Sequence, residues 1–484
     1  MSFNSYIFIL LFLPLVLIGY FGLNSVKKEK TAILFLVLMS LWFCGFQGME
    51  SLAVLLVSAL FNYGIQAAIR TEKKKKLYLT VGILLNIGVL FCFKYYNFFI
   101  ENVNGITGSS LPYWKLVLPL GISFYTFGQI AYLVDSYRGE CEKTSFTEYL
   151  LYVTFFPKLV QGPIMRPGEL FLQLSDGEKK KPDFENLCKG LYAFSLGLGK
   201  KVLLADTLAK VVNAGYANME MLHTPDTLLV MICYSLQIYF DFSGYCDMAY
   251  GIGYMLNIRL PINFNSPYKA VSVSDFWDRW HMTLTGFFTR YVYIPLGGSR
   301  RGKCRTLVNI MIVFLISGLW HGANWTFILW GALNGILMVF ERVTKIEKLK
   351  LPRIIKQTVT FFISTFAWSI FRSASLTETL CLWKKLFSGG MGKIAAPICE
   401  CFNDLLEMEI LYRMGLGTVI ERMPGLILIL FAVMLVIACF FMRNTQEKLE
   451  NFTFSNRRML VVVILLLWSI LSLSEISQFL YVNF

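Results

Sequence analysis

The sequence contains 484 residues, of which 56% are hydrophobic and 16% are charged, and its mean hydropathy is +0.57. Soluble globular chains carry about a quarter of their residues as charged side chains, so this composition excludes an ordinary soluble domain and is typical of a membrane protein. The formal net charge of +14 does not indicate nucleic-acid binding, because the basic residues lie in short runs between apolar segments and no nucleic-acid motif accompanies them.

The first long apolar segment, 6–23, carries no charge and is about as long as a helix that crosses a bilayer core of roughly 30 Å. It lacks the basic leader and the small-residue cleavage site of a secretory signal, and many further apolar segments follow it. We therefore expect this segment to be retained as a spanning helix.

Hydropathy along the chain predicts an all-α integral membrane protein, with about twelve spanning helices and additional re-entrant or in-plane helices. The predicted spans are 6–23, 31–46, 51–69, 78–96, 113–134, 189–205, 227–250, 306–321, 325–341, 354–371, 426–442 and 459–475. Segment 148–165 contains a lysine and two prolines, which favour a re-entrant or in-plane element over a crossing. No repeat or soluble domain is evident, so residues 1–484 are expected to form a single polytopic membrane domain.

The placement of lysine and arginine predicts the orientation of the chain. The basic runs at 27–30 and 72–76 flank a hairpin whose own loop, near Gly48, has no basic residue. By the positive-inside rule both runs lie in the cytoplasm and the N-terminus lies outside. The expected location is the cell (cytoplasmic) membrane, with the lipid bilayer as solvent.

The same rule places the basic regions 259–305 and 345–356 in the cytoplasm. The hairpin between them, 306–341, turns at the sequence WHGANW. His321 in this turn is therefore predicted to lie toward the outer side, whereas His281 in the basic region lies toward the inner side.

Two tryptophan–histidine pairs contain two of the three histidines in the chain. His321 lies in the stretch SGLWHGANW, and His281 lies forty residues earlier in VSDFWDRWHMTLTGFFTRYVYIPLGG. The second stretch is predicted to be one amphipathic helix of four or five turns, capped by Ser274 and stopped by Pro295. Its apolar residues recur at helical spacing: Phe276, Trp280, Leu284, Phe287 and Tyr291.

Imidazole chemistry makes these two histidines candidate catalytic residues. The ring titrates near neutrality and can take a proton from a hydroxyl nucleophile. Gly322 would allow a substrate to approach closely, and Asn324 could polarise a carbonyl oxygen. The alternative is structural, with each histidine donating to a carbonyl and the tryptophans anchoring the membrane interface. The third histidine, His223, lies in a polar loop and is interpreted as a surface residue.

Neither tryptophan–histidine pair predicts a metal site, because no carboxylate or cysteine lies at an established ligand spacing from either imidazole. Two carboxylates, Asp241 and Asp247, lie inside or at the end of a predicted span, where a charge is costly and usually paired or functional. They are six residues apart, so they do not share a helical face. Arg259 is a candidate partner, and both an ion pair and a catalytic role are open.

These stretches resemble the signature blocks of the membrane-bound O-acyltransferases. FWDRWHMTLTGFFTRYVYIPLGG and SGLWHGANWTFILWGALNG look like the two main blocks of the family. FDFSGYCDMAYGIGYMLNIRLPINFNSPY and FFPKLVQGPIMRP are similar to blocks of its bacterial polysaccharide branch, typified by alginate O-acetyltransferase membrane subunits. The resemblance runs from about residue 121 to 387. The related D-alanyl transfer proteins of teichoic acid share the tryptophan–histidine blocks.

The resemblance implies a funnel-shaped helical bundle with a thin central wall, a catalytic core over 121–387, and a C-terminal loop with two more spanning helices over 388–484. His321 would activate the acceptor hydroxyl or otherwise promote acyl transfer, and His281 would bind or position the donor side. Asp278 stands where many relatives have a basic residue, which weakens a role for that position in binding donor phosphates. Candidates for lining the substrate path are Trp277, Trp280, Trp320, Asn324, Asp241, Asp247 and Arg279.

The resemblance also implies the partners of the reaction. An acyl donor, acetyl-CoA or an acylated carrier protein, would approach from the cytoplasm as a substrate, with no cofactor bound. The acceptor would be an extracytoplasmic, esterase-like protein that passes the group to a polysaccharide. D-alanyl transfer to teichoic acid is an alternative cargo. A proton-coupled transporter or flippase that relays protons through Asp241, Asp247 and the histidines is an alternative class, although it predicts inverted repeats that the sequence lacks.

Overall fold

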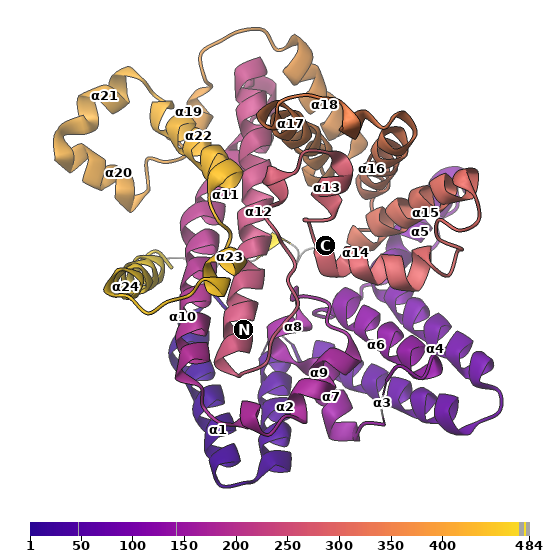
Figure 1. Cartoon of the computed structure of the whole chain (residues 1–484). Coiled ribbons are helices and arrows are strands. Elements are labelled where there is room, and N and C mark those ends of the chain that lie inside the picture. The colour runs from indigo at the N-terminus through magenta and orange to yellow at the C-terminus, as the bar shows by residue number, and fades with distance from the viewer. Residues whose placement is uncertain (47, 142, 474–478, 481–484) are drawn as a thin grey trace.

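The computed structural model describes residues 1–46, 48–141, 143–473 and 479–480, and within these residues the regular elements are all helices (Figure 1). Seven are long and apolar enough to cross a membrane: Phe8–Ser25, Met49–Thr71, Lys75–Thr107, Thr224–Met255, Lys303–His321, Trp325–Thr344 and Arg353–Arg372. An eighth would be the bent pair Leu406–Arg422 and Leu426–Phe441. The predicted all-α membrane architecture is confirmed.

The number of crossings stays a prediction, because several predicted spans form shorter helices. Segments 31–46, 426–442 and 459–475 correspond to α2 (Glu29–Gly45), α22 (Leu426–Phe441) and α24 (Asn456–Leu471), of 16 or 17 residues each. Segment 189–205 corresponds to α10 (Phe184–Gly199) and the π-helical turn Lys200–Ala205.

The predicted span 113–134 is wrong in its first part, since α6 (Ile122–Tyr137) begins only after Gly121. Pro112 and Pro119 lack the amide hydrogen that a helix interior needs. Gly121 adopts a φ of +68°, and a Cβ there would lie 2.3 Å from the carbonyl oxygen of Leu159. The chain therefore turns sharply against the re-entrant region before α6 starts.

Segment 148–165 contains no helix long enough to cross a bilayer. It is divided into α7 (Phe146–Thr154) and α8 (Phe156–Leu159), of nine and four residues, and then an extended stretch that leads to α9 (Pro167–Leu174). The break falls at Phe155, immediately before Phe156 and Pro157. This agrees with the prediction of a re-entrant or in-plane element.

Helix α12 (Thr224–Met255) lies at the centre of the molecule and is buried along most of its length. It packs antiparallel to α10 and also contacts α11 (Asp206–Ala217), α17 (Arg353–Arg372), α18 (Leu376–Ser388) and α22. Two glycine pairs allow the close approach to α10. A Cβ on Gly251 would lie 2.5 Å from the carbonyl oxygen of Gly190, and one on Gly244 would lie 2.8 Å from that of Gly197. Side chains at these positions would force the two backbones apart.

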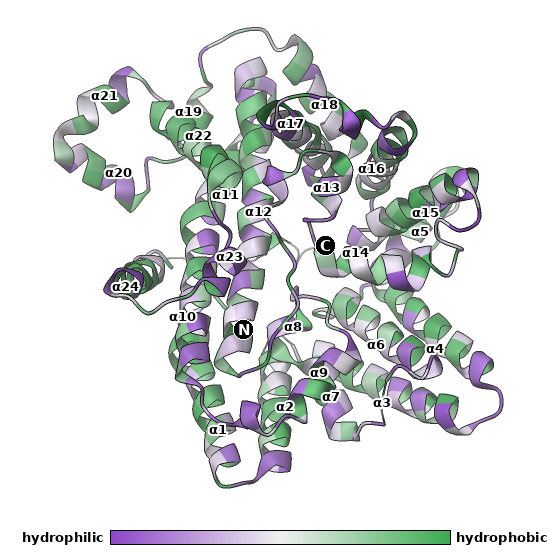
Figure 2. Ribbon diagram, in the orientation of Figure 1, coloured by the Kyte–Doolittle hydropathy of each residue, from purple (hydrophilic) through white to green (hydrophobic). Residues whose placement is uncertain are grey.

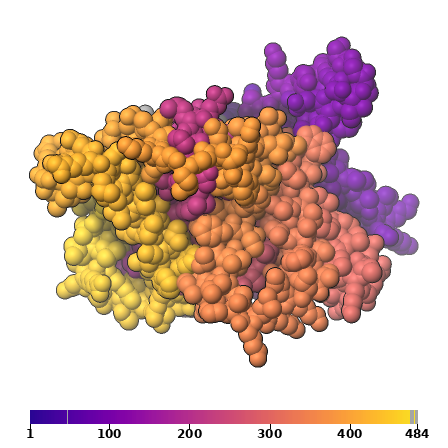
Figure 3. Space-filling view, turned by 90° about the horizontal axis from the view of Figure 1, so that it is seen from above, coloured from indigo at the N-terminus to yellow at the C-terminus, as the bar shows by residue number. Residues whose placement is uncertain are grey.

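Hydrophobic side chains cover much of the outer surface, as a surface in contact with lipid requires. Figure 2 shows hydrophobic residues along α3 (Met49–Thr71), α4 (Lys75–Leu90) and α22, and hydrophilic residues in the loop between α3 and α4. Large side chains such as Leu60 and Leu84 are more than half exposed. Seen from above, the C-terminal helices, in yellow, form one side of the molecule, and a purple part of the chain that follows the N-terminal helices projects on the opposite side (Figure 3).

Candidate active site

The hairpin of α15 (Lys303–His321) and α16 (Trp325–Thr344) positions His321. Its turn lies at 322–324, as the sequence predicted. A Cβ on Gly318 would lie 2.3 Å from the carbonyl oxygen of Phe327, so glycine at this position lets the two helices cross closely. His321 is the last residue of α15 and is only 4% exposed.

Aromatic rings surround the imidazole of His321. Its centroid lies 4.8 Å from that of Trp320, 5.2 Å from that of Trp330 on α16 and 5.2 Å from that of Phe371 on α17. The backbone carbonyls of Trp320 and His321 accept hydrogen bonds from the ammonium of Lys94, at 2.6 and 3.3 Å. A cation at these terminal carbonyls stabilises the end of α15. Sequence reasoning did not single out Lys94, although a lone lysine inside a predicted span was a usable signal.

The second tryptophan–histidine stretch forms two short helices, not the single helix predicted. The helices are α13 (Val273–Trp277) and α14 (Met282–Phe288), and between them His281 adopts a left-handed backbone with a φ of +46°. Ser272, not Ser274, caps α13 through a hydrogen bond from the amide of Asp275. A left-handed conformation costs a non-glycine residue about 1–3 kcal/mol and is often found at functional sites.

Pairing with an extended segment explains the break in the helix. The amide of Met282 donates to the carbonyl of Asn263 (3.0 Å), and the amide of Asn265 donates to the carbonyl of Arg279 (3.0 Å). Residues 263–265 therefore run beside 279–282 and replace helical hydrogen bonds in that stretch.

Asn263 also holds the imidazole of His281. Its Oδ1 lies 3.0 Å from His281 Nδ1 and accepts hydrogen bonds from the amide and hydroxyl of Thr283, at 3.3 and 2.9 Å. The backbone donor fixes which end of the Asn263 amide is oxygen, so Nδ1 of His281 carries the hydrogen and Nε2 carries a lone pair. Among the described residues, the buried Nε2 has no hydrogen-bond partner.

The two imidazoles meet at a single indole. The centroid of Trp320 lies 6.3 Å from that of His281 and 4.8 Å from that of His321, and the indole is 5% exposed. Its Nε1 is buried with no hydrogen-bond partner in the described part of the chain. Buried polar atoms are nearly always satisfied in folded proteins, so these two ring nitrogens, Nε2 of His281 and Nε1 of Trp320, are available for a hydrogen bond to a ligand or water. One ring separates the histidines, although the sequence placed them toward opposite sides.

Comparison with known proteins identifies the family of the chain. A model of the MBOAT (membrane-bound O-acyltransferase) family matches residues 38–377. The chain belongs to this family. It is 36% identical to the peptidoglycan O-acetyltransferase of Helicobacter pylori, over 100% of this chain and 97% of that protein. It is 35% identical to the probable alginate O-acetylase AlgI of Azotobacter vinelandii, over 81% of this chain and 79% of that protein. It is 28% identical to the teichoic acid D-alanyltransferase of Bacillus subtilis, over 54% of this chain and 70% of that protein.

The chain is thus a membrane O-acyltransferase, which confirms the family expected from its tryptophan–histidine blocks. The other predicted site residues of this O-acyltransferase are held by packing contacts, and their contact with substrate stays a prediction. Trp277 contacts Trp330 (centroids 5.6 Å apart), which in turn contacts His321, so it belongs to the wall around that histidine. Trp280 is fully buried against Trp368 at 4.8 Å.

Two predicted polar residues make structural hydrogen bonds. Arg279 forms an ion pair with Asp275 at 2.6 Å within the arm that carries His281. Asn324 caps α16 by accepting from the amide of Thr326 and donates to the carbonyl of Ala374 at 2.8 Å. Both ends of its amide are therefore engaged, and its predicted contact with substrate stays a prediction.

The intramembrane carboxylates of the O-acyltransferase pair with lysines of the π-helical turn after α10. Asp241 lies 2.7 Å from the ammonium of Lys201, and Asp247 lies 2.6 Å from that of Lys200. Arg259, the partner suggested by the sequence, forms neither pair. The close crossing of α10 and α12 brings these lysines to the carboxylates, which supports the structural interpretation of the two aspartates.

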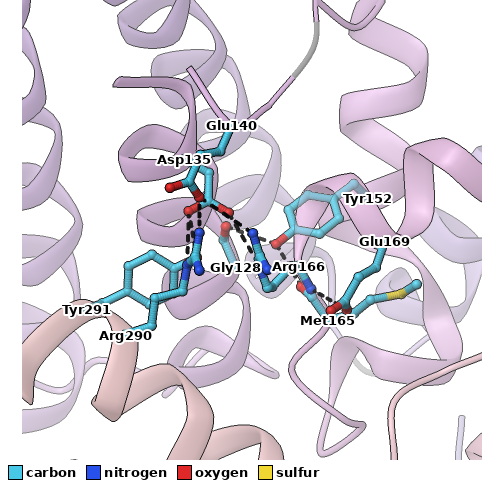
Figure 4. Close-up of polar contacts among 9 residues, drawn as sticks. All are labelled: Gly128, Asp135, Glu140, Tyr152, Met165, Arg166, Glu169, Arg290 and Tyr291. Carbon is cyan, nitrogen blue, oxygen red and sulfur yellow. Dashed lines mark hydrogen bonds and ion pairs between the residues drawn. The ribbon is translucent and has the colours of Figure 1, made fainter. Parts of the chain in front are cut away.

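A further ionic network joins the re-entrant region to the arm that carries His281 (Figure 4). Asp135 at the end of α6 is nearly fully buried and lies 3.6 Å from both Arg166 and Arg290. It also accepts a hydrogen bond from the hydroxyl of Tyr291 at 2.9 Å, and Arg290 pairs with Glu140. The network fixes α6, the start of α9 and the end of the arm relative to one another. Sequence reasoning did not find it, because its members come from segments up to about 150 residues apart in the chain.

The Asp241–Lys201 pair can be tested by a mutant cycle. Breaking a buried pair costs up to about 3–5 kcal/mol, and we expect less here because Lys201 keeps a second partner, Asp206, at 2.8 Å. Replacing both members of a buried pair by apolar residues is close to neutral. We expect Asp241→Leu to lower the midpoint of thermal unfolding in detergent, and Lys201→Met/Asp241→Leu to recover most of the loss. The matched control Arg259→Gln should leave the midpoint unchanged. A double variant that is less stable than Asp241→Leu alone would contradict this assignment.

Proposed function

We propose that this O-acyltransferase moves an acetyl group from a cytoplasmic thioester to a hydroxyl acceptor on the outer side of the membrane, for O-acetylation of a cell-envelope polysaccharide. The observation that carries the proposal is the meeting of His281 and His321 at the buried indole of Trp320. A short path with one histidine at each end suits a transfer between two substrates that arrive from opposite sides. The inside and outside assignments follow from the basic loops and form part of the proposal.

His321 is the proposed general base. It removes the proton from the acceptor hydroxyl, whose oxygen attacks the thioester carbonyl; the thiolate leaves and takes up a proton, so the ester forms without an external co-reactant. The aromatic surroundings of the ring keep bulk water away from the reacting carbonyl. The indole N–H of Trp320 is a candidate donor to the carbonyl oxygen as negative charge develops.

His281 is proposed to position the donor. With Nδ1 held by Asn263, the lone pair on Nε2 is available to accept a hydrogen bond from an amide N–H group of the donor. Acetyl-CoA and an acylated carrier protein both present such groups on the arm that bears the thioester. With the proposed cell-membrane location and outward N-terminus, the protein segment that carries His281 lies on the cytoplasmic side, where the donor would enter.

Peptidoglycan or a related exported glycan is the proposed final acceptor. The match to the peptidoglycan O-acetyltransferase covers essentially both chains, whereas those to the alginate O-acetylase and the D-alanyltransferase cover less of this chain. An extracytoplasmic esterase-like protein is the proposed intermediate carrier. D-alanyl transfer is the second candidate, and the 28% identity to a D-alanyltransferase over 54% of this chain is its support.

Replacing His321 tests the proposed base. We expect His321→Ala to lower the ester content of the glycan by about a hundredfold or more, because loss of a general base typically costs 10²–10⁴ in rate. The measurement is alkali-released acetate from purified glycan, normalised to the amount of protein in the membrane. His223→Ala, which changes the remaining histidine in a partly exposed position beside Asp226, is the matched control. Normal acetate release from the His321 variant would refute the assignment.

Replacing Asn263 tests its role as a positioning residue. Asn263→Leu removes the acceptor for His281 Nδ1, and support of this kind typically contributes tenfold to a hundredfold. We expect kcat to fall by that factor in Asn263→Leu and to recover substantially in Asn263→Asp, whose carboxylate still accepts all three hydrogen bonds. The assay is acetyl transfer to a soluble acceptor, compared at equal amounts of folded protein. Equal activity of the two variants would show that the amide does not act through the imidazole.

A further inference from the structure

An apolar cavity of about 560 Å³ lies between α10 and α12 on one side and α20 (Leu406–Leu411), α22 and α24 on the other. This volume is in the range of small-molecule sites. Its walls are mostly aliphatic and aromatic side chains, including Leu203, Phe240, Phe431, Leu435 and Leu465. The helices that enclose it expose leucines such as Leu430 and Leu467 outward, so the cavity lies within the hydrocarbon layer. An apolar cavity of this kind excludes water and favours hydrocarbon.

The cavity is elongated along α22. Its lining residues follow that helix from Ile427 to Cys439, about 20 Å at 1.5 Å per residue, compared with a bilayer core of about 30 Å. An extended acyl chain fits such a length, whereas a compact ligand does not require it.

The polar groups of the cavity divide by charge between its two ends. At the C-terminal end of α22 are Lys200, Arg443 and Lys448, whereas Glu407 lies at the opposite end and accepts a hydrogen bond from the indole of Trp468. Lys200 is neutralised by Asp247, but neither Arg443 nor Lys448 forms an ion pair with a carboxylate of the described residues. Burial, and then the neighbouring Lys200, lower the pKa of Lys448, and the carboxylates of Asp247 and Glu447 offset this shift only in part.

We propose that this cavity binds a phospholipid with an anionic headgroup, whose acyl chain lies along α22 and whose phosphate contacts Arg443 and Lys448. The connection 442–455 carries both cations and lies between two apolar helices, and Arg457 and Arg458 follow it at the start of α24. The positive-inside rule therefore places this connection at the cytoplasmic leaflet, where anionic lipids are found. Basic pockets between membrane helices are a recurrent means of binding such headgroups. The site is separate from the proposed acetyl transfer, and its failure would leave that proposal intact.

The headgroup end of the cavity adjoins the support of the catalytic arm. A small polar pocket that also contains Lys200 and Thr445 is lined by Asp247 and Asn263. Asn263 holds the imidazole of His281. A lipid at this site would therefore stabilise the helices against which that arm packs.

Lipid retention by the purified full-length protein tests the proposal. The protein is equilibrated in detergent with equimolar phosphatidylglycerol and phosphatidylcholine, and the retained lipid is counted by native mass spectrometry. We expect the unmodified chain to prefer phosphatidylglycerol by about thirtyfold, since each of the two cations near the headgroup contributes about 1 kcal/mol. Arg443→Gln/Lys448→Gln should abolish the preference. The matched control Arg353→Gln/Arg457→Gln, which removes two exposed cations outside the cavity, should keep it.

A second variant tests the apolar part of the cavity. Ala438 lines the wall, and Ala438→Phe should displace the chain and lower retention of both lipids. Size-exclusion profiles establish that each variant is folded. If Ala438→Phe cannot be purified, the lipid preference of Arg443→Gln/Lys448→Gln alone tests the proposal. An unchanged lipid preference in Arg443→Gln/Lys448→Gln, an equal loss in the control, or retention of a CoA thioester in place of phospholipid would overturn the proposal.

Discussion

The structure depends on the close, antiparallel packing of α12 against α10. Glycines at the two crossing points bring the backbones together, and the same approach carries Lys200 and Lys201 to Asp247 and Asp241. Two carboxylates inside an apolar protein would be costly without these partners. Once neutralised, they allow α12 to remain buried along most of its 32 residues, and the other helices pack around it.

Both histidines are held by elements that contact this central helix. Phe242 of α12 packs edge-on against the ring of His281 at 4.8 Å, and Cys246 accepts a hydrogen bond from the amide of Asn263. Helix α17 packs on α12 and contributes Phe371 to the wall around His321. A shift of α12 would therefore move the two imidazoles relative to each other. The ion pairs that hold α12 against α10 therefore also help to set the positions of the two imidazoles beside Trp320.

The sequence predicted features that depend on local pattern and missed those that depend on distant contacts. Two apolar runs separated by Gly322 and Asn324 specified the hairpin of α15 and α16. Apolar periodicity across His281 is also helical, but periodicity cannot reveal a left-handed residue that is imposed by pairing with Asn263 from another segment. The candidate partner of the two aspartates, Arg259, was wrong for the same reason, because Lys201 lies forty residues from Asp241 and becomes its neighbour only when α10 packs on α12.

The proposed reaction carries an acyl group across the membrane by way of the two histidines. Sealed vesicles of known orientation, with radiolabelled acetyl-CoA at the cytoplasmic face and a hydroxyl acceptor confined to the opposite face, test it most directly. We expect labelled acceptor on the far side with the unmodified protein and none with His321→Ala. Label that appears only when donor and acceptor share one face would contradict it.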